Sequence, residues 1–93
     1  MAKKYLLKLY IMGSTLRSKH AIENARKICE GQLKGKYELE VIDLKKHMQL
    51  AEDEKIFATP TLERKLPIPL KRIIGDLSDS EKVLLGLDIV EHE

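Results

Sequence analysis

The hydrophobic positions in the first half of the chain change period twice. Over residues 3–12 apolar side chains occupy both alternating sets of positions, which is typical of a central strand in a sheet covered on both faces. Over residues 18–33 the apolar positions recur at helical spacing. Residues 37–44 then alternate between apolar and acidic side chains, which predicts a second strand. Strand, helix and strand at these lengths predict a βαβ unit with a right-handed crossover.

The second half has weaker patterns. Residues 45–55 are mostly polar and predict a short helix. Residues 56–62 predict a strand that is entered through a proline. Pro67 and Pro69 exclude a central strand through the segment that follows. Residues 70–74 predict a short strand that stops at a glycine.

The last segment carries two conflicting signals. Ser78 and Glu81 have the spacing of a capping box, which predicts a helix over residues 82–90. The same residues also alternate in hydrophobicity, as a strand does. Gly86 inside a helix costs ~1 kcal/mol relative to alanine. Asp88 would face the negative pole of the helix dipole. Helix and strand therefore both remain open for this segment.

Composition restricts the class of protein. A chain of 93 residues with 43% hydrophobic and 34% charged residues fits one small globular α/β domain. The lone cysteine, Cys29, excludes an intramolecular disulfide and suits a reducing compartment. No apolar run approaches the ~18 residues of a membrane span, and residues 1–5 lack the apolar stretch of a signal peptide. We expect a cytoplasmic protein that does not bind membranes.

Charge is distributed unevenly along the chain. Residues 1–50 contain 11 Lys or Arg against 5 Asp or Glu, whereas residues 51–93 contain 6 against 10. Nucleic-acid binders usually combine a concentrated basic patch with stacking aromatic residues. Here every basic cluster has acidic neighbours, and the four aromatic residues are scattered. We expect a solvated charged surface and no nucleic-acid partner.

The predicted order of elements resembles the thioredoxin-like fold. The segment from Ile56 to Leu62, with Pro60 inside it, is similar to the segment that carries the cis-proline of that superfamily. The superfamily's activity depends on a Cys-x-x-Cys pair between the first strand and the first helix. Residues 13–18 at that place contain no sulfur, which excludes dithiol exchange. Cys29 lies on the apolar face of the predicted helix and is interpreted as an ordinary buried thiol.

Other candidate chemistry is weak. Gly13, Ser14 and Thr15 at a strand-to-helix junction favour a capping turn over an anion site, because the second glycine and the lysine of a phosphate loop are missing. The three histidines are isolated from other metal-ligand residues, so no metal or cofactor is expected. No catalytic constellation emerges. The sequence therefore points to a binding protein and not to an enzyme.

Six stretches together resemble one family of thioredoxin-like proteins. They are residues 5–13 (YLLKLYIMG), 41–44 (VIDL), 49–52 (QLAE), 58–62 (ATPTL), 66–78 (LPIPLKRIIGDLS) and 82–88 (KVLLGLD). By these stretches the chain resembles the KaiB family, small adaptors of the cyanobacterial circadian clock, and the resemblance extends over nearly all of residues 3–90.

This resemblance implies a single metamorphic domain over residues 1–93. Family members have a ground state of order βαββααβ, usually a homotetramer, and a thioredoxin-like monomer of order βαβαββα that binds the KaiC ATPase ring. A shared βαβ unit would cover residues 3–44, and residues 46–90 would switch fold. Gly86, Asp88 and Pro60 are the expected fold-switch residues. Because free members usually adopt the ground state, we expect residues 83–90 to be a strand.

The resemblance also implies partners and contact residues. A KaiC homologue is the expected partner, beside self-association into a homotetramer or dimer. Candidate contacts are the basic residues of the matching motifs and the edge of the second strand, namely Lys55, Lys71, Arg72, Tyr37, Glu38 and Glu40. Glu38 and Glu40 make that strand more acidic than the clock proteins lead us to expect, which counts against KaiA as a partner and leaves it open.

Two alternatives to a clock adaptor remain. The first is a stress-adaptation or scaffold protein that acts without KaiA. The second is a thiol-dependent enzyme on the same scaffold that uses Cys29 or Ser14, which would require an exposed thiol of low pKa in the case of Cys29.

Overall fold

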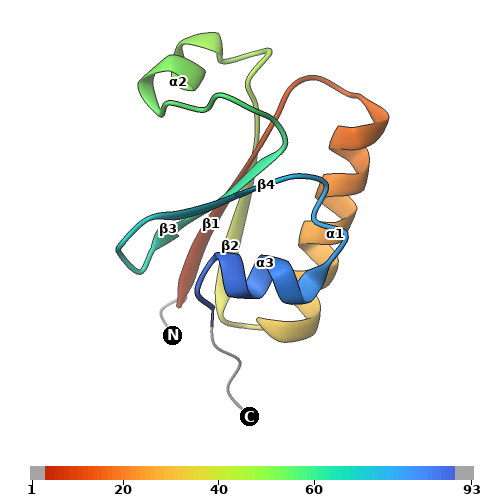
Figure 1. The fold of residues 1–93 in the computed structure, drawn as a ribbon, viewed down its shortest axis with the longest axis vertical. Helices are drawn as coiled ribbons and strands as arrows, with labels where there is room; N and C mark the ends of the chain where they lie inside the picture. Colours follow the sequence, from red (N-terminus) through yellow and green to blue (C-terminus); the bar gives the residue numbers. More distant parts are fainter. Residues whose placement is uncertain (1–3, 90–93) are drawn as a thin grey trace.

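The predicted βαβ unit forms the first half of the molecule. The computed structural model describes residues 4–89. Strand β1 (Tyr5–Ile11) is followed by helix α1 (Leu16–Gln32) and strand β2 (Tyr37–Asp43), as predicted (Figure 1). The first residue of the predicted strand, Lys3, lies outside the described residues. The side chain of Thr15 accepts a hydrogen bond from the Ser18 amide at 3.0 Å and caps α1, which confirms the interpretation of this junction as a capping turn.

The second half continues with helix α2 (Met48–Asp53), strands β3 (Thr61–Leu66) and β4 (Lys71–Ile74), and helix α3 (Ser80–Gly86). The full order is βαβαββα, the order that the thioredoxin-like resemblance implies. The short helix predicted within residues 45–55 and the strand predicted within residues 70–74 are both confirmed. The two prolines at residues 67 and 69 lie in the turn between β3 and β4, outside any strand.

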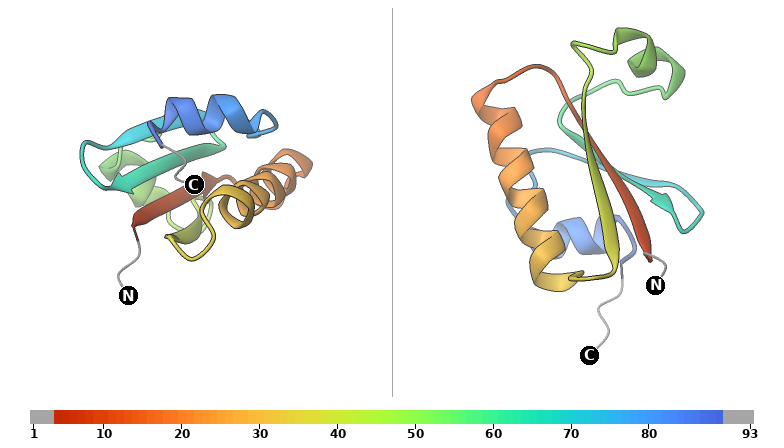
Figure 2. Two further views of the ribbon diagram at one scale, coloured as in Figure 1. Left: turned by 90° about the horizontal axis from the view of Figure 1, so that it is seen from below. Right: turned by 180° about the vertical axis from the view of Figure 1, so that it is seen from behind.

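A mixed four-stranded sheet of order β2-β1-β3-β4 forms the centre of the fold. β1 pairs with β2 in parallel and with β3 antiparallel, and β3 pairs antiparallel with β4. The position of β1 explains why it is apolar on both faces: α1 and α3 enclose the larger core cluster on one face, and α2 packs over a smaller cluster on the other (Figure 2). Tyr10, Ile42, Leu44 and Ile56 make up the smaller cluster.

The strand predicted over residues 56–62 is displaced. β3 begins only at Thr61 and continues through charged residues to Leu66. Ile56 is buried in the smaller core cluster, and the Thr61 hydroxyl donates a hydrogen bond to the Ala58 carbonyl at 2.6 Å. Residues 56–60 therefore form a loop that turns into the sheet. The Thr59–Pro60 peptide bond is cis, in agreement with the resemblance.

The expectation of a strand over residues 83–90 is wrong for this structure, because residues 83–86 belong to α3. Residue 90 lies outside the described residues. Val83 and Leu84 are buried against the sheet and Leu87 follows at the next turn, so helical spacing prevails over the alternation. The N-cap is Asp79 and not Ser78: the Asp79 carboxylate accepts a hydrogen bond from the Lys82 amide at 3.2 Å.

The C-terminal end of α3 places two predicted switch residues differently from the expectation. Gly86 is the last helical residue, and Asp88 lies beyond the C-cap with a φ of 54°. The Ile89 amide bonds to the Leu84 carbonyl at 2.9 Å and the Asp88 amide to the Leu85 carbonyl at 3.1 Å. This is a Schellman motif, in which Asp88 occupies the left-handed position that usually holds glycine. Asp88 is therefore a terminating residue and not an interior residue of the helix.

Candidate functional site

The candidate contact residues lie on two separate surfaces. Tyr37, Glu38 and Glu40 belong to β2, whereas Lys71 and Arg72 belong to β4. β2 and β4 form the opposite edges of the sheet. Lys55 joins the second group, because its carbonyl oxygen accepts a hydrogen bond from Arg72 Nη1 at 3.1 Å. The structure therefore brings Lys55 and Arg72 together and separates them from the β2 residues. Lys71 directly precedes Arg72 on β4, so its side chain points to the opposite face of the sheet.

Arg72 is an internally bonded cation. Its Nε lies 2.8 Å from Glu63 Oε2, and its two terminal nitrogens donate to the carbonyls of Lys55 and Glu54. The side chain is 32% exposed. The guanidinium thus uses its planar fork to join β4, β3 and the loop after α2. Arg72 organises this edge more than it offers a free charge to a partner.

Glu63 is the buried anion of this network. It is fully buried although it lies in a charged stretch of sequence. The Tyr10 hydroxyl donates to Glu63 Oε1 at 3.5 Å from the other side. Burial, followed by the nearby Glu63 charge, raises the pKa of Tyr10 to about 12. Tyr10 therefore stays protonated and able to donate at neutral pH.

Beside this network the loop after α2 presents an exposed apolar surface. Phe57 is 92% exposed and Ile74 is 62% exposed. They line a shallow hollow of about 90 Å³ together with Lys55 and Arg72. Lys55 is exposed and adopts a φ of 56°, which is unusual for a residue other than glycine. An aromatic side chain next to basic groups at a free sheet edge has the composition of a protein-binding surface.

The β2 edge is acidic and largely self-paired. The Tyr37 hydroxyl donates to Glu30 Oε2, and this hydrogen bond, followed by partial burial, raises the pKa of Tyr37 to about 12. Glu40 Oε1 lies 3.8 Å from Lys8 Nζ. Glu38 is exposed on the same strand. Tyr37 and Glu40 already have partners, so Glu38 is the exposed residue of this group that is best placed to meet another molecule.

The position of a thioredoxin dithiol is occupied by a structural turn. The Gly13 amide donates to Asp43 Oδ1 at 2.9 Å, and the same oxygen accepts from the Lys45 amide at 2.9 Å. Cys29 is 1% exposed in the larger core cluster, and burial followed by the Glu30 charge raises the pKa of its thiol to about 12. The prediction of an ordinary buried thiol is confirmed. A buried, protonated thiol is not a nucleophile at neutral pH.

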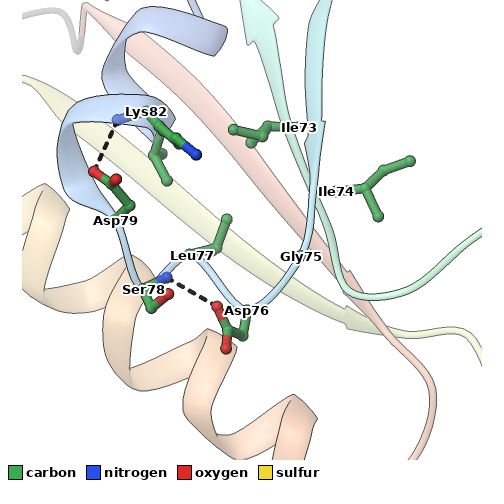
Figure 3. A pocket seen from close by; sticks show the side chains of 9 residues that line it. Ile73, Ile74, Gly75, Asp76, Leu77, Ser78, Asp79 and Lys82 are labelled. Carbon is green, nitrogen blue, oxygen red and sulfur yellow. Dashed lines mark hydrogen bonds between the residues drawn. The ribbon is translucent and has the colours of Figure 1, made fainter.

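The hollow between β4 and the start of α3 is lined by apolar and polar side chains, and the polar ones form hydrogen bonds within the loop (Figure 3). The Ser78 amide donates to Asp76 Oδ1 at 3.0 Å, and Asp79 caps α3. The hydrogen bonds from the Ser78 side chain and amide hold the pKa of Asp76 below its ordinary value. The carboxylates of Asp76 and Asp79 are thus engaged in turn and cap formation.

Sequence reasoning missed two buried charged residues in β3. Glu63 is one of them, and the other is Arg64, which donates to the carbonyls of Pro69 at 2.7 Å and Asp88 at 3.1 Å. Both lie in a run of three charged residues, a pattern that predicts a solvated surface. The available signal was the apolar Leu62 and Leu66 on either side, which fit a strand that continues through the charges.

Within residues 4–89 no group of three or more His, Cys, Asp or Glu side chains is arranged to hold a metal ion. The histidine at residue 92 lies outside this part of the chain. None of the described helices is long and apolar enough to cross a membrane.

Comparison with known proteins assigns the family. The family model of the KaiB domain matches residues 8–89. The circadian clock oscillator protein KaiB of Prochlorococcus marinus NATL2A is 56% identical over 91 residues, which are 98% of this chain and 85% of the relative. KaiB of Synechococcus elongatus PCC 7942 is 54% identical over 91 residues, with 98% and 89% covered.

Solved structures agree in fold. The N-terminal domain of Synechococcus elongatus SasA superposes with a TM-score of 0.74 at 23% identity, covering all of this chain and 91% of that one. Mitochondrial thioredoxin 3 of Saccharomyces cerevisiae gives 0.71 at 16% identity, covering 92% and 78%. These identities are low, so the superpositions establish the thioredoxin-like fold alone. The match of the family model and the identity to these relatives establish that the chain belongs to the KaiB family.

Proposed function

We propose that this chain is a non-enzymatic adaptor that binds a KaiC-type ATPase ring in the cytoplasm and so regulates KaiC phosphorylation and timing output. The observation that carries the proposal is a thioredoxin-like fold whose dithiol position is a sulfur-free turn and whose lone thiol is buried. Such a fold retains a surface for partners and lacks the groups for redox catalysis. The similarity to relatives named circadian clock oscillator proteins supports the clock role.

The β4 edge is the proposed KaiC-binding surface. It combines the exposed cation of Lys55 with the apolar side chains of Phe57 and Ile74 around Arg72. The half-buried Lys71 lies on the other face of the same strand. Aromatic residues that become buried in a complex beside basic groups are frequent interface anchors. We assign the β2 edge around Glu38 to a second partner. The acidic Glu38 and Glu40 count against KaiA as that partner and leave it open.

We also propose that the chain switches between two folds and self-associates in the second one. Residues 46–90 would rearrange from βαβαββα to the βαββααβ tetramer or dimer, and residues 3–44 would stay as they are. Pro60, Gly86 and Asp88 are the proposed switch positions. The unusual backbone of Asp88 in this structure supports its assignment, since an extended segment would relieve the left-handed conformation.

The direct test is association with a KaiC ring. Wild-type protein is incubated for hours with a cognate KaiC homologue and nucleotide and then analysed by size-exclusion chromatography. Co-elution is expected, and Lys55→Ala should weaken it. A wild-type chain that stays free of the ring at every incubation time would refute the adaptor function and leave a scaffold or stress role.

The reactivity of Cys29 distinguishes the adaptor from a thiol-dependent enzyme. At neutral pH the native protein should react with a thiol reagent only after denaturation, because the side chain is buried and its thiol is protonated. Rapid labelling of the folded chain would favour an enzyme.

A further inference from the structure

Glu63 occupies a position where a carboxylate is costly unless it is paired. It lies in the middle of β3 with Lys8 of β1 as register partner on one side and Arg72 of β4 on the other. Its side chain is inaccessible to solvent. A buried carboxylate requires a cation and hydrogen-bond donors. Arg72 and Tyr10 supply both, so the Glu63 side chain has a fixed position.

The fixed Glu63 in turn orients Arg72. The Glu63–Arg72 contact uses Nε, and this leaves the two terminal nitrogens of the guanidinium directed at the loop after α2. They donate to the carbonyls of Glu54 and Lys55, which are consecutive residues. A planar fork bound at one side points its other donors in a defined direction. The side chains of Glu63 and Arg72 therefore fix the position of this turn's backbone relative to β3.

The turn itself has one residue in the left-handed region and is held both by its own backbone hydrogen bonds and by Arg72. Lys55 has a φ of 56°, where a side chain with a Cβ is unfavourable. The Ile56 amide bonds back to the Ala51 carbonyl at 2.8 Å, and Lys65 Nζ lies 3.7 Å from Glu54 Oε1. The direction in which the side chains of Lys55 and Phe57 leave the surface depends on this turn.

We propose that Glu63 is a positioning residue for the partner-binding edge. It cannot touch a partner, since it is fully buried. Through Arg72 it fixes the backbone of Glu54 and Lys55 and so presents Lys55 and Phe57 in one arrangement. The proposal deepens the proposed function, because it assumes that the β4 edge binds the KaiC-type ring.

The first test concerns the free protein. Glu63→Gln keeps the shape and one acceptor but removes the charge, and Glu23→Gln on the exposed face of α1 is the matched control. Amide hydrogen exchange is measured by NMR. In Glu63→Gln the Ile56 amide should exchange about 10-fold faster, the order expected from losing a charge-assisted hydrogen bond. Amides in the middle of α1 and all amides of the control should exchange as in wild type.

Arg72→Lys provides a second variant if Glu63→Gln fails to fold. Lysine keeps a cation next to Glu63 but has no fork that reaches both carbonyls, so the same local increase in exchange is expected. An unchanged rate at Ile56 in either folded variant would overturn the proposal. A rate increase spread equally over α1 would also overturn it, because that result is a loss of global stability.

The second test measures binding to the KaiC ring in a double-mutant cycle of Glu63→Gln and Lys55→Ala. Each single variant should bind about 5- to 10-fold more weakly, and the double variant should lose less than the product of the two losses. Multiplicative losses would overturn positioning through Lys55. If the wild-type chain itself does not bind the ring, the proposed function fails, and the hydrogen exchange at Ile56 still decides whether Glu63 fixes the turn.

Discussion

Replacing Asp88 by glycine should stabilise the fold described here. Asp88 adopts a φ of 54° directly after α3, and the Schellman hydrogen bonds on both sides involve only backbone atoms. Glycine removes the cost of a Cβ in the left-handed region, which we take as ~1 kcal/mol for aspartate. It also removes a negative charge from the negative end of the helix dipole, worth ~0.3–1 kcal/mol. The free energy of unfolding should therefore rise by ~1–2 kcal/mol.

Two further variants separate these two contributions. Asp88→Asn removes the charge and keeps a residue that tolerates the left-handed conformation, so it should gain ~0.3–1 kcal/mol. Asp88→Ala removes the charge but not the backbone cost. Arg64 donates to the Asp88 carbonyl, which all three variants retain. Urea unfolding followed by circular dichroism gives the free energies, and size-exclusion chromatography with NMR reports whether the monomer of order βαβαββα gains population.

Glycine should be the most stabilising of the three substitutions, because it alone removes both the backbone cost and the charge. Glycine and asparagine variants of equal stability would show that an asparagine side chain carries no backbone cost in the left-handed conformation at this position, which contradicts the ~1 kcal/mol assigned to aspartate. A glycine variant less stable than wild type would contradict the assignment of Asp88 to the end of α3. If the chain has a second fold in which this segment is extended, the gain corresponds to roughly 5- to 30-fold in the equilibrium between the folds.

Three other substitutions give clear expectations. Gly86→Ala should leave the thermal midpoint nearly unchanged, because the gain in helix propensity of up to ~1 kcal/mol is offset by a close contact of 3.0 Å between the new Cβ and Ile73 Cδ1. In an Ile73→Val background, which removes that carbon, the same change should raise the thermal midpoint. Thr15→Ala should lower the free energy of urea unfolding by ~1 kcal/mol through loss of the cap of α1, whereas a loss below ~0.2 kcal/mol would contradict the capping role. The backbone hydrogen bonds to Asp43 lower its pKa, so its stabilising effect is present above the unfolded-state pKa of about 4 and is lost as the pH falls through the lower folded value. In Asp43→Asn the free energy of urea unfolding should therefore depend less on pH between about pH 5 and pH 2.

The first half of the fold was predictable because its signals are local and agree. The period of the apolar residues in β1 and α1, the capping turn at Thr15 and the alternation in β2 each predict the element that forms there. In the second half the tertiary contacts decide. The helical spacing of Val83, Leu84 and Leu87 prevails over an equally visible alternation only because the sheet offers an apolar face at that place.

The candidate site was only partly predictable for a related reason. Lys55 and Arg72 were identified as basic residues within matching motifs, and the structure joins them by a hydrogen bond. Glu63, which orients Arg72, was missed because a carboxylate in a run of charged residues is normally solvated. The apolar residues on either side of that run indicate the strand but not the burial of its charges. The separation of Tyr37 from the β4 edge follows from the strand order, which depends on pairings between residues far apart in the sequence.

The buried pair at Glu63 also restricts how the strands align. Register partners across the whole sheet form one row of alternating charge, made of Glu40, Lys8, Glu63 and Arg72. A slip of β3 by one residue would turn Glu63 toward the apolar face under α1 and α3, where a carboxylate without a partner costs several kcal/mol. A slip by two residues would place it opposite Leu6 or Tyr10 of β1 instead of Lys8. The charges that obscure β3 in the sequence therefore select a single strand alignment and disfavour mispaired sheets during folding.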